Sequence, residues 1–566
     1  MSTSSTSSKH DLTKAEMGAG EKNSDPEATV GNYAASVDSD EDDLRRMGYK
    51  SEFKREFTNL STISFAFSIM GLASSVATTL DTPLIYGGGP ASVVWCWLIG
   101  SCMCFCLGMS IAEIVSAYPT NGGLYSASAY LVPRKYKAFV GWTVGWLNLL
   151  GQVAGVASTD FGLAKMILAA ATISTDGTYV AQNGHIVGTF VAILCIHGLL
   201  NSCGTKVLAM VTQTFVFVNL GSVAAIIIAL LVTTKDRHDA TYVFTHTDNN
   251  TGWSSDGLAF LFGLLSVQWT MTDYDATAHI CEEVKRASIA APVAIAVAVI
   301  GTGTIGFFYN MVYVYCSGDL TQLPGPSGYS AATIIANNVG KKGFYAIWFF
   351  VCFTAFAVGA TALQANARTF HAFSRDHGLP DRGLFARLAP NKVPVYAVWL
   401  VIFISICMGL LQFASTTATT AIFALCAIAL DTSYCIPIAC KLIFRNHPEV
   451  MFRPGPFSLG TGFIGWALPL IACSWTSFVV CLVYDLDFEA TFANDALAQV
   501  VILALPTVIP IDQLNMNYAA PITGAVMILS WIWYYAGGRR HYHGPRNVLK
   551  EEQEAETGVA YVPNSE

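Results

Sequence analysis

The feature that most constrains this chain is a series of long apolar stretches that recurs from residue 58 to residue 536. A helix of about 20 apolar residues is what the hydrocarbon core of a bilayer requires. We therefore expect an all-α integral membrane protein. Its twelve membrane-spanning helices are predicted at residues 58–80, 91–116, 138–170, 184–201, 206–233, 256–281, 290–316, 344–367, 395–412, 416–440, 463–484 and 517–536.

The composition agrees with a membrane protein and excludes several other classes. The chain is 53% hydrophobic and 12% charged, whereas soluble proteins carry about 25% charged residues. A net charge of −8 without a basic stripe argues against nucleic-acid binding. The GxSxG, HExxH and Walker-type motifs are missing from the sequence. We therefore expect no enzyme activity, no catalytic residue, no cofactor and no metal site.

Polar segments flank the apolar region. Residues 1–48 are rich in Ser, Thr, Asp, Glu and Lys, which predicts a disordered cytoplasmic tail. Residues 537–566 are again polar and are expected to form a second cytoplasmic tail, so that residues 49–536 make up the twelve-helix membrane domain. The apolar stretch 498–510 is too short to span a bilayer, and we interpret it as an outer-loop or re-entrant piece.

The distribution of Lys and Arg predicts the orientation. With the N-terminus inside, the five inner loops hold fourteen Lys and Arg residues and the outer loops hold four. Cytoplasmic loops of membrane proteins carry such an excess of positive charge. Both termini are therefore expected in the cytoplasm. The sequon Asn249-Asn250-Thr251 then falls in an outer loop, which makes Asn249 a glycosylation candidate.

The first span contains a point at which its helix could open. Gly71 is followed by Leu72, Ala73, Ser74 and Ser75 in the middle of the apolar run. A break there would free backbone N–H and C=O groups to face a ligand. The alternative is that small residues let two intact helices pack closely.

Carboxylates interrupt the sixth span. Asp273 and Asp275 each cost about 2.5–3.5 kcal/mol at the centre of a membrane helix, so we predict that they take part in proton coupling. Glu282 and Glu283 follow about two turns later, and they are either hydrated at the inner interface or part of a gate. Because spans one and six begin two five-helix halves, paired breaks indicate an inverted-repeat transporter with a midplane site.

Several motifs, in order, resemble those of amino acid–polyamine–organocation transporters. Glu113 to Tyr125, with Pro119 and Gly122-Gly123, is similar to the inner end of their second span. Tyr274 to Glu283 resembles the sixth-span signature of the fungal amino acid/choline transporter branch, which includes γ-aminobutyrate permeases. Three later segments of this chain resemble motifs of that branch: Ser374-Arg375-Asp376, Gly455-Pro456-Phe457 and Met516-Asn517-Tyr518.

This resemblance implies a five-plus-five inverted repeat with broken helices 1 and 6, followed by two extra helices. It also implies a plasma-membrane location, with the vacuolar membrane as the alternative. The substrate would bind between the two broken spans, and a cytoplasmic gate would involve Glu113, Glu282 and Glu283. The implied substrate-binding residues are Gly71, Leu72, Ala73, Ser74, Gln152, Trp269, Thr270, Thr272, Asp273 and Tyr274.

The expected function is import of γ-aminobutyrate or related amino acids across the bilayer by alternating access, with protons as co-substrate. A choline or polyamine permease of the same fold is the alternative. Asp273 stands where the branch usually has Gly, which favours a more cationic substrate or adds a proton acceptor. Some bacterial relatives carry the coupling proton on a Lys in span five, but the stretch Val216 to Leu220 contains none.

Overall fold

The computed structural model of the 566-residue chain describes residues 40–414, 418–450, 452–481 and 518–545. The stretch 498–510 lies outside these residues. The helices in chain order are α2 (Asn59–Met70), α3 (Leu72–Thr79), α4 (Asp81–Ile85), α5 (Pro90–Ala117), α6 (Gly123–Tyr130), α7 (Lys137–Ser174), α8 (Asn183–Asn201), α9 (Thr205–Thr233), α10 (Ala240–Thr245), α11 (Asp256–Phe262), α12 (Leu264–Thr270), the 3-10 helix η2 (Tyr274–Glu283), α13 (Ala287–Tyr315), α14 (Ser330–Arg375), α15 (Val395–Gly409), α16 (Ala418–Ile443), α17 (Phe463–Cys481) and α18 (Ala519–Ala536).

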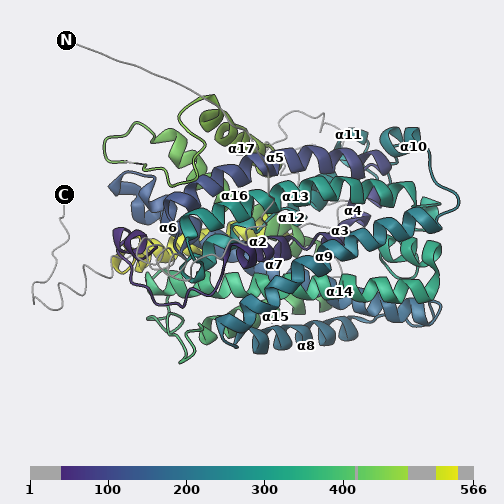
Figure 1. The fold of residues 1–566 in the computed structure, drawn as a ribbon, viewed down its shortest axis with the longest axis horizontal. Coiled ribbons are helices and arrows are strands. Elements are labelled where there is room, and N and C mark those ends of the chain that lie inside the picture. Colours follow the sequence, from purple (N-terminus) through teal and green to yellow (C-terminus); the bar gives the residue numbers. More distant parts are fainter. Residues whose placement is uncertain (1–39, 415–417, 451, 482–517, 546–566) are drawn as a thin grey trace, which may run out of the picture.

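The long helices lie side by side along the long axis of the molecule (Figure 1). Among the described residues, 10 helices are long and apolar enough to cross a membrane. The most extensive packing joins α5 to α13 and joins α7 to both α16 and α14. The short helices α10 and α11 lie at one end of this bundle, and α6 lies at the other (Figure 1). The protein is therefore an all-helical membrane protein.

Two of the twelve predicted spans are not among these 10 helices. The segment predicted at 256–281 is divided into α11, α12 and η2. The span predicted at 463–484 contains α17, whose apolar part is Phe463–Val479, and residues 482–484 lie outside the described residues. The division of the sixth segment has a physical cause, because Asp273 adopts a left-handed backbone and the buried Asp275 carboxylate bonds to side chains of other helices.

Gly71 breaks the first span between α2 and α3. Its backbone is left-handed, with φ 45° and ψ 51°, a conformation that glycine adopts without steric cost. The Asn219 side chain from α9 bridges the gap: its Oδ1 accepts from Ala73 N–H at 3.1 Å and its Nδ2 donates to Phe67 O at 3.4 Å. The hydroxyl of Ser75 donates to Met70 O at 2.8 Å. These contacts satisfy backbone groups that lipid could not.

The sixth span breaks after α12 ends at Thr270. Asp273 adopts a left-handed backbone with φ 59° and ψ 16°, and η2 begins at the next residue. Aspartate is one of the few residues that enter this region routinely. The Asp273 backbone N–H donates to the hydroxyl of Tyr434 on α16 at 3.1 Å. Since α2 contacts η2 and α3 contacts α12, the two breaks lie beside each other.

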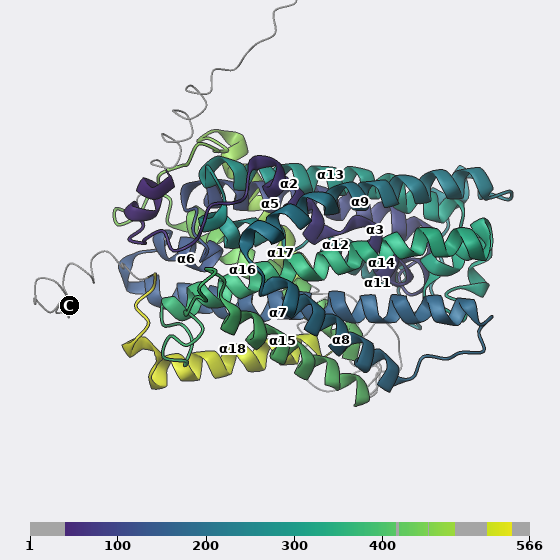
Figure 2. The same ribbon diagram turned by 60° about the horizontal axis from the view of Figure 1, so that its bottom comes forward.

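Residues 40–57, which we call the N-terminal strap, run across the end of the bundle that holds α6 (Figure 2). The Asp40 carboxylate accepts from the backbone N–H groups of Arg286 at 2.7 Å and Ala287 at 3.2 Å, where α13 begins. Phe57 forms an isolated parallel bridge with Val284. The Tyr49 hydroxyl donates to Asp376 at 2.9 Å. The strap thus joins the start of α13 to the end of α14.

The N-terminal strap begins within the segment that was predicted to be a disordered N-terminal tail. Residues 40–48 were expected to be disordered, but residues 40–46 are helical. Leu44, Met47 and Tyr49 bury together in a small apolar cluster. The composition of this polar segment gives no sign of these contacts, because the partners of Asp40 and Tyr49 lie hundreds of residues away. Near the C-terminus, residues 537–545 also pack against the helix bundle, since Tyr542 is fully buried and contacts the ring of Trp142.

Gly71→Ala should impair both folding and transport. A Cβ atom at this position would overlap Cγ2 of Val358, and the positive φ would strain any L side chain. We expect a loss of about 1–3 kcal/mol of stability, measured as a lower melting temperature of the purified protein together with reduced uptake. Gly188→Ala on α8 is the control, because nothing lies within 4 Å of its added methyl group. Equal melting temperatures for the two variants would show that the break does not require glycine.

Candidate functional site

The two breaks border a cavity of about 20 Å³. This volume holds about one water molecule, so an amino acid does not fit in the cavity in this conformation, which we call the closed conformation. The lining residues come from both broken spans and from three other helices. They are Ile69, Ser75, Gly155, Thr159, Trp269, Thr270, Thr272, Asp273, Val358, Ala362 and Cys426.

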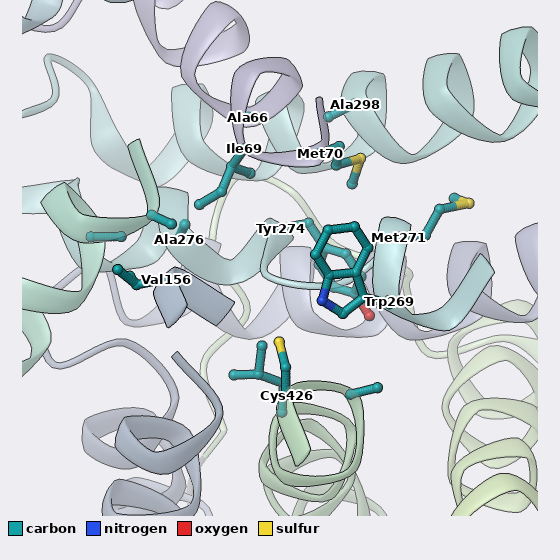
Figure 3. Close-up of a cluster of buried hydrophobic side chains, with 14 of the residues drawn as sticks. Ala66, Ile69, Met70, Val156, Trp269, Met271, Tyr274, Ala276, Ala298 and Cys426 are labelled. Carbon is teal, nitrogen blue, oxygen red and sulfur yellow. The ribbon is translucent and has the colours of Figure 1, made fainter. Parts of the chain in front are cut away.

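Trp269 forms an aromatic wall of this cavity. Its Nε1 donates to Ser158 Oγ at 3.1 Å, and its ring centroid lies 4.6 Å from that of Phe423. Figure 3 shows its ring beside Cys426 of α16, with Ile69 near the end of α2. An aromatic face next to a carboxylate is a suitable surface for an ammonium group, through charge attraction and cation–π contact.

Four of the predicted substrate-binding residues line the cavity: Trp269, Thr270, Thr272 and Asp273. The other six do not line it. Gln152 is buried, and both polar atoms of its amide lack a hydrogen-bond partner among the described residues. Tyr274 is buried with its ring centroid 5.3 Å from that of Tyr434.

The remaining predicted residues, Gly71 to Ser74, form the break itself. The N–H groups of Gly71, Ala73 and Ser74 donate to Phe67 O, Asn219 Oδ1 and Gly71 O respectively. The backbone donors expected to receive a substrate carboxylate therefore have partners within the protein in this conformation. The cavity-lining residues on either side of them in the chain are Ile69 and Ser75.

The two carboxylates of the sixth break have different surroundings. Asp273 lines the cavity, and its Oδ1 is buried without a hydrogen-bond partner among the described residues. Asp275 is fully buried and well bonded: it accepts from Tyr434 OH at 2.5 Å and from Asn148 Nδ2 at 3.0 Å, and it faces His279 Nε2 at 3.1 Å. Asp273 is therefore available to a ligand, whereas Asp275 belongs to a network.

Two buried ion pairs close the bundle at the end of η2. Glu283 Oε1 lies 2.8 Å from Arg368 Nε, and neither side chain is exposed. Glu282 Oε1 lies 3.2 Å from Arg375 Nη2 and also accepts from the Asn121 N–H at 3.1 Å. Both arginines belong to α14. These contacts favour the gate interpretation of the two glutamates over the hydrated one.

Glu113, the third predicted gate residue, belongs to a different cluster. Its carboxylate pairs with Lys441 and accepts from Ser458 Oγ and Leu459 N–H, each at 3.0 Å. It therefore anchors α5 to the segment that follows α16. The structure does not bring it together with Glu282 and Glu283.

Sequence reasoning missed several residues on which these contacts depend. Asn219 and Tyr434 hold the two breaks, and Arg368 neutralises Glu283. The amide of Asn219 in a long apolar span was an available signal, because polar side chains there usually bond across helices. Arg368 was counted only as an inner-loop charge.

Other polar residues within the spans form local pairs. Asp160 pairs with His197 at 3.0 Å, and Asp431 accepts from Gln268 Nε2 at 2.8 Å. The glycosylation candidate Asn249 lies between α10 and α11, where its Nδ2 donates to Trp253 O at 2.9 Å.

Comparison with known proteins agrees with this architecture. The profile of a family described as amino acid permease matches residues 57–528. The chain is 44% identical over 525 residues to an uncharacterized amino-acid permease of Schizosaccharomyces pombe, covering 92% of each chain. It is 37% identical over 519 residues to amino-acid permease 2 of Neurospora crassa (90% of each chain). It is 30% identical over 540 residues to the GABA-specific permease of Saccharomyces cerevisiae, covering 94% of this chain and 90% of that one. The chain therefore belongs to the amino acid permease family, whose members are membrane transporters and not enzymes.

Proposed function

We propose that this permease imports γ-aminobutyrate or a related amino acid by alternating access, in symport with protons. The observation that carries the proposal is Asp273, which lines the cavity between the broken helices and has an unpartnered Oδ1. A buried carboxylate needs a donor or a cation. The ammonium group of an amino acid supplies both, and the Trp269 ring adds a cation–π surface. The similarity to a permease named GABA-specific supports this choice.

The carboxylate of the substrate is proposed to bind at the start of α3, where a helix N-terminus favours negative charge. In the closed conformation the Asn219 Oδ1 accepts from the Ala73 N–H and so takes the place of a carboxylate oxygen. Binding would displace this amide when the cavity widens. Gln152, with both amide atoms unpartnered among the described residues, offers a further polar contact.

A choline or polyamine permease is the second candidate. The backbone donors at the first break already have partners, whereas Asp273 does not. A carboxylate oxygen without a partner, beside backbone donors that are already bonded, favours a cation without a carboxylate. Competition for uptake distinguishes the two candidates.

The proposed topology has twelve spans in a five-plus-five inverted repeat followed by two helices. The breaks at Gly71 and Asp273, in the first helices of the two halves, support this arrangement. The excess of Lys and Arg in alternate loops supports cytoplasmic termini. We propose the plasma membrane as the location, with the vacuolar membrane as the alternative, and glycosylation at Asn249 on the outer face.

The pairs Glu282–Arg375 and Glu283–Arg368 are proposed to form the cytoplasmic gate. Both pairs connect η2, which continues the broken sixth span, to α14. Opening to the inside would separate these elements and hydrate the four charges. Glu113 would contribute indirectly, by fixing the segment that follows α16.

The deciding experiment measures uptake of labelled γ-aminobutyrate into transport-deficient cells that express this chain, at acidic and neutral outside pH. Choline, putrescine and neutral amino acids serve as competitors. Acid-stimulated uptake that is blocked by ω-amino acids supports the first candidate. Uptake blocked by choline or putrescine supports the second. Absence of γ-aminobutyrate uptake in cells with confirmed surface expression contradicts the first, and uptake of labelled choline and putrescine then tests the second.

Asp273→Asn should weaken substrate binding, because the amide cannot neutralise an ammonium group. We expect the apparent affinity to fall at least about tenfold, which corresponds to about 1.4 kcal/mol. Concentration dependence of uptake provides the measurement. Asp431→Asn is the matched control, since Asp431 bonds to Gln268 and does not line the cavity. Equal loss in both variants would refute a direct role for Asp273.

Arg368→Ala should destabilise the closed conformation, because it leaves Glu283 buried without its cation. Removing one partner of a buried ion pair costs about 3–5 kcal/mol. Thermal unfolding of the purified protein measures the loss. Lys341→Ala removes an ion pair with Asp176 whose side chains are 47% and 79% exposed, and it should leave the melting temperature unchanged. Similar melting of the two variants would contradict a buried gate.

A further inference from the structure

Asp275 and His279 form a buried pair within η2, just beyond the cavity residue Asp273. Neither side chain is exposed, and His279 Nε2 lies 3.1 Å from Asp275 Oδ2. The other ring nitrogen, Nδ1, lies 3.2 Å from the carbonyl oxygen of Asn121. Gly123 packs against the ring, since an added Cβ would lie 2.6 Å from His279 Cε1. The imidazole is therefore held between two acceptors.

These hydrogen bonds fix the number of protons on the pair. A carbonyl oxygen only accepts, so His279 Nδ1 carries a proton. The Tyr434 hydroxyl accepts from the Asp273 N–H and therefore donates to Asp275 Oδ1. A second proton must lie between Asp275 and His279, on either the imidazole or the carboxyl group. Without it, an imidazole lone pair would face a carboxylate in a site without solvent.

Charged and titratable groups lie on η2 and on the elements around it. Glu282 and Glu283 of η2 are balanced by Arg375 and Arg368 of α14, and Glu113 of α5 is balanced by Lys441. Arg55 of the strap pairs with Asp40 near Cys281. The other such groups nearby are Asp273, Tyr274, Cys104, Cys426, Asp431 and Tyr434.

A chain of contacts leads from the pair to the cytoplasmic end. Asn121, whose carbonyl accepts from His279, donates its own backbone N–H to Glu282 Oε1 at 3.1 Å. Glu282 is bonded to Arg375, which lies 3.8 Å from Glu52 of the strap. Glu52 is 38% exposed. Burial raises the pKa of its carboxyl group, and Arg375 opposes that rise. Opening of the gate would therefore bring water to His279.

We propose that the Asp275–His279 pair binds the coupling proton and that His279 is the residue that releases it to the cytoplasm. This inference rests on the proposed proton symport. The closed conformation requires the proton between the two side chains, so closure of the loaded transporter depends on it. When Glu282 and Glu283 separate from their arginines, the proton passes from the pair to water. The pair is then left as a neutral imidazole and a carboxylate.

The test compares two fluxes of labelled γ-aminobutyrate in proteoliposomes that contain the full-length protein. Exchange is measured with substrate on both sides and no pH gradient. Accumulation is measured with an inward gradient of one pH unit, which drives about tenfold accumulation when one proton accompanies each substrate. We expect His279→Gln and Asp275→Asn to continue to exchange, to lose accumulation above equilibrium and to show a flat pH profile.

His197→Gln is the matched control. His197 is equally buried and paired with an aspartate, Asp160, but this pair joins α8 to α7 and lies outside the broken spans. This variant should keep both exchange and accumulation. If His279→Gln does not fold, Asp275→Asn decides the question, because its amide can donate to a neutral His279 and preserve the hydrogen bond.

Three outcomes overturn the inference. The first is wild-type accumulation by His279→Gln with an unchanged pH profile. The second is loss of exchange in the folded variants, which would place the pair in substrate binding. The third is equal loss of accumulation in His197→Gln. Wild-type protein that exchanges substrate but never accumulates it with the pH gradient refutes proton symport itself, and the two failures are thereby distinguished.

Discussion

Inside a bilayer, every backbone N–H and C=O group needs a partner from the protein, and this requirement governs the two broken spans. Asn219 of α9 bonds to both sides of the first break, and Tyr434 of α16 accepts from the second. Tyr309 of α13 adds a contact of its hydroxyl with Ala73 O at 3.4 Å. Because these partners lie on unbroken helices, each break ties separate parts of the bundle together.

In the proposed gate, the same constraint would make the paired charges at the end of η2 act as a switch. Burying an ion pair gains little stability, because the desolvation cost offsets the attraction between the charges. Glu282 and Glu283 each have an α14 arginine as partner in the closed conformation, and the four charges would be hydrated in an open one. Intermediate separations leave charges that are neither paired nor hydrated. Two discrete arrangements of this end are therefore favoured over a continuous range.

The spans and the two breaks could be predicted from the sequence because they depend on local patterns. Apolar runs mark the helices, and Gly71 and Asp273 carry the backbone conformations that interrupt them. The partners that satisfy the breaks could not be predicted, since Asn219 and Tyr434 lie 146 and 161 residues away from the groups they bond.

The candidate site was predicted only in part for the same reason. Trp269 and Asp273 line the cavity as the sixth-span pattern indicated. The N–H of Ala73 was expected to be free for a ligand, but a side chain from another helix bonds to it. Residues 40–48 resembled a solvated tail because their composition is polar, and only the fold shows that Asp40 caps α13. Local composition does not report such distant pairings.

The N-terminal strap also determines the order in which the molecule can be completed during its synthesis. Tyr49 and its partner Asp376 are 327 residues apart. At roughly 5–20 residues per second, a ribosome needs about 16–65 s to make that length of chain. The strap must therefore wait, beside a growing set of inserted helices, until α14 has been made. Attachment of the strap to the end of α14 is a late event in the biogenesis of this permease, although it depends on residues that are translated early.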